Sequence, residues 1–172
     1  MTKRQQTREK ILQAAWGSFA QNGYEATTTR QIAKQAGVAD GTVFSHFPTK
    51  LSILREGMLE QLTAISQDTL ENAEGKTDVE IGLALTEQYY RYYFTNVELS
   101  RALLKEVIWD LDYYQSFNQA LFQSASEQTI AAEKMPLILD CYFMTLITHL
   151  NRPEPNVELA LEELHAKFKL IV

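Results

Sequence analysis

Apolar residues recur along this chain every three or four positions, which is the spacing of one face of an α-helix. No stretch alternates apolar and polar residues as a half-buried strand would. We therefore predict an all-α protein of about nine helices. The predicted ranges are 7–22, 28–36, 40–47, 50–71, 78–95, 97–111, 113–132, 135–150 and 157–171, and a basic, polar arm over residues 2–7 precedes them.

The most informative stretch reads TTRQIAKQAGVADGTVFSHFPTK. Thr28 and Gln31 have the spacing of a capping box, and Gly37 supplies the positive φ that ends a helix. Ala33 lies four residues before Gly37 and ten before Val43. Ala33 is thus a small residue at the place where the two helices cross closely. Val43 is a branched residue that holds the second helix in position. This pattern is typical of a DNA-binding helix-turn-helix. An ordinary helical hairpin that Gly37 merely caps is the alternative.

Charge divides the chain near residue 55. The first 55 residues hold eight Lys/Arg and three Asp/Glu, a net charge of +5, and the remainder holds eight and nineteen, a net charge of −11; together they give the −6 of the whole chain. A positive N-terminal part on an acidic remainder suits a protein that turns one end toward phosphates. Chance unevenness is the alternative explanation.

The sequence offers little for chemistry or for a membrane. Its one cysteine, Cys141, cannot form an internal disulfide, and no Cys/His cluster has metal-ligand spacing. There is no glycine-rich phosphate loop and no nucleophile elbow. We predict no catalytic residues, no metal and no cofactor. No apolar run is long enough to span a bilayer and no signal-like segment opens the chain, so we expect a cytoplasmic protein.

A family resemblance is concentrated between residues 7 and 56. The residues that carry it are Gly23-Tyr24, Thr27-Thr28, Ile32-Ala33, Ala36-Gly37-Val38, Gly41-Thr42, Phe44, His46-Phe47 and Lys50. In this pattern the chain resembles the tetracycline-repressor (TetR) type of transcriptional regulator. The resemblance implies a helix-turn-helix DNA-binding domain of three helices, predicted over residues 1–52. It also implies a helical ligand-binding and dimerisation domain over 53–172, where the likeness is in helical layout and length.

The resemblance and the physics of helix ends together predict the DNA contacts. Helix N-termini and lysines bind phosphates, which points to Thr28 and Lys50. The family's histidine position, here His46, implies another backbone contact. Thr42 lies in the first turn of the recognition helix, where it can meet a base edge or a phosphate. The full predicted DNA-binding set is Thr28, Arg30, Gln31, Asp40, Thr42, Phe44, Ser45, His46 and Lys50.

Two of these residues depart from the family's pattern. Phe44 stands where the family usually has tyrosine, so the phenol's phosphate bond is lost, although the ring can still touch a thymine methyl. Asp40 stands where a small or basic residue is common. Its carboxylate either accepts from a cytosine amino group or supports the N-terminus of its helix, and we favour the second role. Val43 and Phe47 are expected in the core.

The remainder of the chain is rich in aromatic residues with polar tips, which suit a site for a flat or amphipathic small molecule. The resemblance implies an inducer pocket in this region. The residues predicted to line it are Tyr89, Tyr93, Trp109, Tyr113 and Phe117. The competing interpretation is that each of them is an ordinary core residue.

Residues 135–150 are apolar on almost every side, so that helix must be covered on most faces. The resemblance implies that the last two helices form a dimer interface, and a two-fold dimer independently explains the apolar surface by bundling four helices. The predicted interface residues are Tyr142, Leu146, Leu161, Leu164 and Phe168. A dimer of this kind reads a palindromic operator in double-stranded DNA.

We therefore expect a ligand-responsive repressor, and not an enzyme. It would bind its operator as a homodimer and be released by a small apolar or aromatic inducer. One alternative is a helix-turn-helix protein that is gated by a protein partner or acts without an inducer. A helical-bundle enzyme or carrier is more remote, because no paired carboxylates, metal ligands or nucleophile–base pair have useful spacing.

Overall fold

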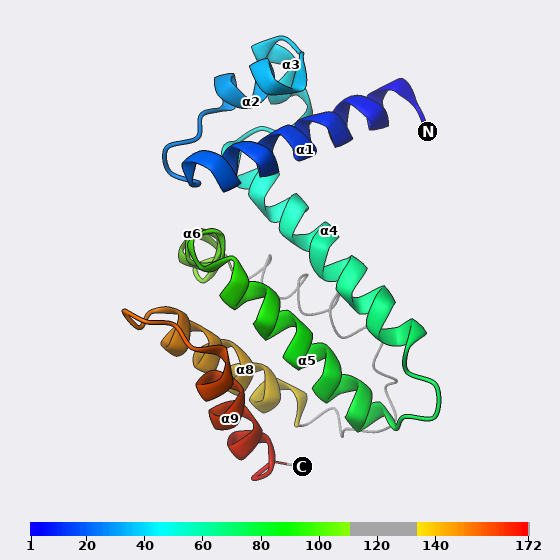
Figure 1. Ribbon diagram of the computed structural model, residues 1–172, viewed down its shortest axis with the longest axis vertical. Coiled ribbons are helices and arrows are strands. Elements are labelled where there is room, and N and C mark those ends of the chain that lie inside the picture. Colours follow the sequence, from blue (N-terminus) through cyan, green and yellow to red (C-terminus); the bar gives the residue numbers. More distant parts are fainter. Residues whose placement is uncertain (111–133, 172) are drawn as a thin grey trace. The chain divides into compact units, whose positions relative to one another are not determined.

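The computed structural model describes residues 1–110 and 134–171 (Figure 1). Within these residues every regular element is an α-helix, which confirms the all-α prediction. The helix predicted at 113–132 lies outside the described residues. None of the described helices combines the length and hydropathy that a membrane span requires.

The chain divides into two compact units, Met1–Gln61 and Leu62–Val172. The boundary between the units falls inside one continuous helix, α4, which runs from Lys50 to Glu71 and has the predicted bounds. The predicted division into domains of residues 1–52 and 53–172 stays a prediction.

The first unit contains α1 (Lys3–Asn22), α2 (Thr29–Ala36), α3 (Asp40–His46) and the first part of α4. Helix α1 packs against α2, and α2 packs against α3 (Figure 1). Ile32 and Ala33 of α2 are fully buried, and so is Val43 of α3. The small side chain of Ala33 lets these helices approach closely, as the sequence predicted.

Helix α1 begins earlier than predicted. Residues 2–7 were expected to be a polar arm, but Thr2 caps a helix that starts at Lys3. The Thr2 amide donates to Gln5 Oε1 (2.7 Å), and the Gln5 amide donates to Thr2 Oγ1 (3.2 Å). This is a complete capping box, and the Lys, Arg and Gln residues that follow are good helix formers.

The second unit contains the end of α4 together with α5 (Asp78–Thr95), α6 (Val97–Val107), α8 (Met135–Leu150) and α9 (Val157–Phe168). Helix α8 packs along α9, α5 contacts α6 and α9, and α6 contacts α8. The prediction extended α6 to residue 111. It ends earlier because the Asp110 amide donates to the carbonyl of Val107 (3.0 Å), a three-residue turn that closes the helix.

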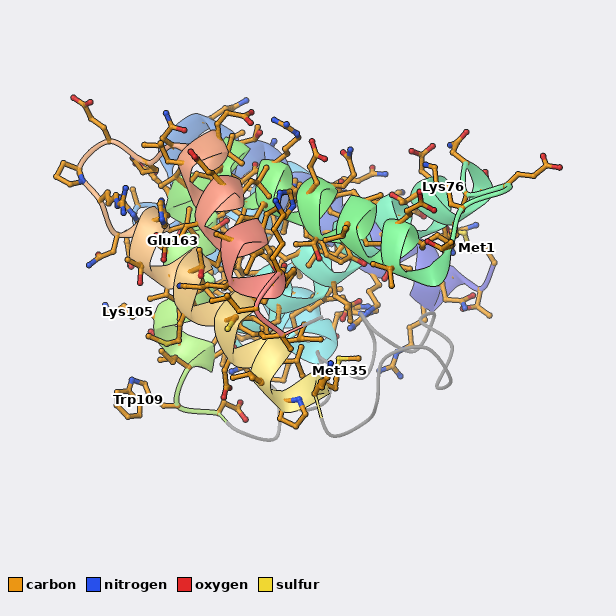
Figure 2. All side chains as sticks on the ribbon, turned by 90° about the horizontal axis from the view of Figure 1, so that it is seen from below. Met1, Lys76, Lys105, Trp109, Met135 and Glu163 are labelled. Atoms are coloured by element: carbon orange, nitrogen blue, oxygen red, sulfur yellow. The ribbon has the colours of Figure 1, made fainter. Side chains whose placement is uncertain are left out.

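A chain of polar side chains crosses the seam between α8 and α9. Buried His149 places Nε2 2.8 Å from Glu163 Oε2, and because a carboxylate only accepts, the imidazole is the donor. Lys167 Nζ lies 2.7 Å from Glu163 Oε1 and donates to Thr145 Oγ1 (2.8 Å). The hydrogen bonds from Lys167 and His149 lower the pKa of Glu163 to about 2. Figure 2 shows Glu163 beside α8.

This seam predicts a loss of stability in acid. A carboxylate with a lowered pKa stabilises the fold above its ordinary value near 4.5, and that contribution disappears as the pH falls toward 2. Glu163→Gln should therefore remove a contribution on the order of 1 kcal/mol, discounted for partial exposure, and flatten the pH dependence between these values. Urea unfolding measured from pH 2 to 7 tests this. Glu162→Gln, an exposed neighbour, is the control, and identical pH profiles for both variants would contradict it.

Candidate DNA-binding interface and candidate ligand and self-association surfaces

Thr28 caps the N-terminus of α2 as the sequence predicted. The Gln31 amide donates to Thr28 Oγ1 (3.2 Å), and the Thr28 amide donates to Gln31 Oε1 (2.7 Å). Both side chains are exposed, as is that of Arg30. The capping box gives hydrogen-bond partners to the backbone N–H groups of Thr28 and Gln31. The positive end of the helix dipole faces solvent beside exposed Arg30.

The turn between α2 and α3 has the geometry that a helix-turn-helix needs. Gly37 adopts φ 68°, in the left-handed region that favours glycine, and the Val38 amide donates to the carbonyl of Ala33 (3.0 Å). Asp40 then enters the first turn of α3, with Oδ2 3.9 Å from Arg30 Nε. A carboxylate in the first turn can stabilise the N-terminus of its own helix, and this role for Asp40 stays a prediction.

Helix α3 separates its core residues sharply from its exposed ones. Val43 is buried completely, and Phe47, which follows the helix, is 1% exposed, so both lie in the core as predicted. Phe44, by contrast, is 51% exposed. Ser45 is also exposed and donates its hydroxyl to the carbonyl of Thr42 (2.8 Å). The outward side of α3 thus offers an aromatic ring and small polar groups, which can contact base edges in a groove.

Thr42 and His46 are half-buried at the border of this outward side. The carbonyl of His46, the last residue of α3, accepts from Arg8 Nη1 of α1 (2.7 Å). Arg8 also pairs with Glu56 of α4 and stacks 4.1 Å from the centroid of the Phe47 ring. A cation therefore closes the C-terminal end of α3, where the helix dipole favours positive charge.

Lys50 begins α4, and its ammonium faces the loop between α1 and α2. Nζ donates to the carbonyls of Tyr24 (2.6 Å), Thr27 (2.9 Å) and Glu25 (3.2 Å). Sequence reasoning missed these partners because they lie more than twenty residues away in the chain. The predicted roles of the DNA-binding residues stay predictions. Apart from Arg30, the exposed cations of unit 1 lie outside the predicted DNA-binding set. These exposed cations are Lys3, Arg4, Lys10, Arg30 and Lys34.

Of the residues predicted to line an inducer pocket, Tyr89 and Tyr93 lie one turn apart on α5, and Trp109 lies beyond the end of α6. Tyr89 and Tyr93 are buried in the core of unit 2, and the Tyr89 hydroxyl lies 2.5 Å from Ser66 Oγ. Burial raises the pKa of the Tyr89 phenol. Trp109 is 87% exposed, and Figure 2 shows it projecting away from the helices. Tyr113 and Phe117 lie outside the described residues.

A cavity of about 670 Å³ lies elsewhere in unit 2, between the first turns of α5, the start of α8 and the end of α9. Its size is within the range of small-molecule sites. The walls include Val79, Leu83, Ile138 and Phe168, and Lys169 stands at its edge. Sequence reasoning missed this cavity because its wall residues come from α5, α8 and α9, which are distant from one another in the chain. No group of three or more His, Cys, Asp or Glu in the described ranges is placed to hold a metal ion.

The residues predicted for a dimer interface are mostly inside the chain. The exposed fractions of Tyr142, Leu146, Leu161 and Leu164 are between 0 and 4%, and Phe168 is half-buried. Tyr142 packs edge-on against Tyr90 of α5, so the side of α8 that carries it is covered within one chain. The sequence shows which residues are apolar but not which molecule covers them. The outward faces carry different apolar residues, which are Leu137, Met144 and Leu159.

Residues 11–56 match the sequence profile of the family "Bacterial regulatory proteins, tetR family". The HTH-type transcriptional regulator YvkB of Bacillus subtilis (strain 168) is 33% identical over 121 residues, which cover 67% of this chain and 64% of YvkB. The fatty acid metabolism regulator protein of the same organism is 38% identical over 71 residues, which cover 39% of this chain and 37% of that protein. The chain thus spans less than two thirds of either relative.

A solved structure has the same fold over nearly the whole chain. Thermus thermophilus FadR, a TetR-family transcriptional repressor in complex with lauroyl-CoA, gives a TM-score of 0.77 at 22% sequence identity. The match covers 95% of this chain and 92% of that one. At this identity the likeness concerns the fold, and it extends the agreement beyond residues 11–56 to the helices of unit 2.

Substitutions of Phe44 and Phe47 should have different effects, one on duplex binding and the other on the stability of the fold. Phe44→Ala should weaken duplex binding roughly tenfold, or about 1.4 kcal/mol, and change the free energy of unfolding by less than about 0.5 kcal/mol. Phe47→Ala should instead destabilise the fold by about 3–5 kcal/mol because it empties a core position. Fluorescence anisotropy with labelled duplex and urea unfolding measure the two quantities. A Phe44→Ala protein that binds duplex normally would contradict the assignment of the outward face.

Proposed function

Since the chain belongs to the tetR family of bacterial regulatory proteins, we propose that it is a DNA-binding transcriptional repressor. It binds a palindromic operator as a homodimer and releases it when a small apolar molecule enters unit 2. The observation that carries this proposal is the geometry of α3, which buries Val43 and Phe47 and turns Phe44 and Ser45 outward. A short helix supported in this way fits the major groove.

The charge distribution supports the same orientation on DNA. Arg30 and Lys34 are exposed on α2, and α1 exposes Lys3, Arg4 and Lys10. Such cations neutralise phosphates and make the affinity depend steeply on salt. The N-terminus of α2 beside Thr28 adds backbone N–H groups for a phosphate. The acidic remainder of the chain is repelled by the duplex, which favours contact through unit 1.

Regulation in this proposal passes along α4. This helix begins in unit 1 and continues without interruption into unit 2, so a ligand that alters its position in unit 2 also alters unit 1. The ligand must bind the two conformations with unequal affinity, because only a difference in affinity shifts an equilibrium. Release then follows when the two recognition helices of the dimer no longer match the repeat of the duplex.

We propose an amphipathic acyl compound as the ligand. The T. thermophilus neighbour is in complex with lauroyl-CoA, and one relative is a fatty acid metabolism regulator. The cavity beside α5 supports the acyl part of such a ligand, since Val79, Leu83 and Ile138 offer apolar walls. Its lining also carries charges of both signs, from Glu80, Glu87 and Lys169. A second possibility, a repressor gated by a protein partner or acting without inducer, is favoured by the complete burial of Tyr89 and Tyr93.

Two matched leucines test the ligand proposal. Lauroyl-CoA at about one hundred times its Kd should stabilise the protein by about 2.7 kcal/mol and raise its Tm, whereas free CoA should not. Leu83→Asp places a charge in the cavity wall and should abolish this shift. Leu70→Asp alters a leucine of α4 with nearly the same exposure, 36% against 37%, and should preserve it. No shift with acyl-CoA of any chain length would favour the repressor without inducer.

The self-association surface lies on the outward sides of α8 and α9. Leu137 and Met144 are seven residues apart on α8, and Leu159 and Ala166 are seven apart on α9, all of them exposed. Seven-residue spacing is the pattern by which helices pack side by side. Two copies that join these faces across a two-fold axis make a four-helix bundle, which buries the apolar stripes that one chain leaves exposed.

A charge at the centre of this surface should separate the dimer. Met144 is 56% exposed, so Met144→Glu should leave the fold intact yet weaken dimerisation by roughly two orders of magnitude, because the two-fold axis brings like charges together. Sedimentation equilibrium at micromolar concentration measures the change. Leu70→Glu is the control and should remain dimeric. A Met144→Glu protein that dimerises as tightly as the wild type would place the interface elsewhere.

A further inference from the structure

The ammonium of Lys50 is fully engaged inside unit 1. An ammonium has three N–H donors, and Lys50 Nζ has three carbonyl acceptors within 3.2 Å, on Tyr24, Glu25 and Thr27. It also lies 4.2 Å from the centroid of the Tyr24 ring, which adds a cation–π attraction. In this arrangement no N–H of Lys50 remains for a DNA phosphate.

The loop that Lys50 holds is fixed from its other side by Thr27. This side chain is buried, and its hydroxyl lies within hydrogen-bonding distance of the carbonyls of Gly23 (2.7 Å) and Ser18 (3.2 Å). The Thr27 amide donates to the carbonyl of Tyr24 (3.2 Å). Since Glu25 is exposed, the loop has few packing contacts at its tip and depends on these polar bonds.

The residue that follows this loop is the N-cap of α2. The Thr28 hydroxyl accepts from the Gln31 amide at the start of α2, and the preceding residue, Thr27, is held by the bonds just described. The three bonds of Lys50 connect this position to the first turn of α4. A change in the position of that turn therefore reaches the N-terminus of α2 through one side chain.

We infer that Lys50 is a positioning residue for DNA binding: it ties the first turn of α4 to the α1–α2 loop and so orients the N-terminal turn of α2 toward a phosphate, without binding the phosphate itself. This inference rests on the proposed function, because it presumes that α2 faces DNA. It replaces a direct contact with an indirect one, and the two roles have different consequences for salt dependence.

Salt dependence distinguishes the two roles. Each phosphate contact adds about 0.9 to the slope of log K against log salt concentration. Lys50→Met keeps the aliphatic stem but removes all three donors. If Lys50 positions α2, this variant loses affinity roughly tenfold or more while its slope stays within about 0.3 of the wild type. Thr27→Val removes the hydroxyl that bonds to the carbonyls of Gly23 and Ser18, and it changes no charge. It should also lower the affinity for DNA without changing the salt slope.

Because both variants loosen one loop, their effects should not add, and the double variant should bind about as weakly as either single variant. The probe is a 30-base-pair duplex that the wild-type protein enriches from a random library. Lys50→Gln, which keeps a donor, serves if Lys50→Met does not fold. Lys50→Met with unchanged affinity, or with a slope lowered by about 0.9, would overturn the inference.

Amide hydrogen exchange tests, without DNA, whether Lys50 holds the α1–α2 loop in place. The Thr27 amide donates to the Tyr24 carbonyl and the Thr28 amide to Gln31 Oε1, so both report on the loop and the cap. In Lys50→Met we expect both to exchange at least about tenfold faster while the core amides of α1 stay protected. Unchanged exchange of the Thr27 and Thr28 amides in Lys50→Met would overturn the inference that Lys50 holds this loop. If no duplex is enriched, the proposed function fails, yet this measurement still decides the role of Lys50 within the fold.

Discussion

The orientation of α3 depends on the burial of one side of this very short helix. Helix α3 has seven residues, far fewer than an isolated helix needs to be stable in water. It persists because Val43 is enclosed completely and because Phe47 packs under Arg8. That burial fixes the rotation of α3 about its axis. Phe44 and Ser45 are consequently left exposed, so packing within unit 1 sets which side of α3 faces solvent.

Unit 1 uses its cations in two distinct ways. Arg8 and Lys50 lie inside the fold, where Arg8 binds the carbonyl of His46 and Lys50 binds carbonyls of the α1–α2 loop. Both satisfy backbone carbonyls that have no partner within a helix. Other cations, such as Arg30 and Lys34, remain at the surface and supply the field that attracts phosphates. Net charge alone does not distinguish these roles.

The features that were predictable from the sequence are local ones. The capping box of Thr28 and the left-handed Gly37 depend on residues within a few positions, and both are present. The partners of Lys50 and the packing of the Trp16 ring over Gly57, where even a Cβ would overlap the indole, depend on distant segments. No short pattern encodes them.

For the candidate sites, the sequence predicted composition better than location. Tyr142 is apolar enough for an interface, but it is covered within its own chain, and its carbonyl accepts from the Tyr90 hydroxyl (2.6 Å). Trp109 belongs to the aromatic-rich region, yet it is exposed. In each case hydrophobicity alone left open which surface would cover the residue.

The most direct test of the central claim is hydroxyl-radical footprinting of the wild-type protein on duplexes enriched from a random library at low ionic strength. The account predicts two protected half-sites related by a two-fold axis and centred about one helical turn, or a multiple of it, apart. Failure to enrich any duplex, or protection of a single site without a symmetric partner, would contradict it.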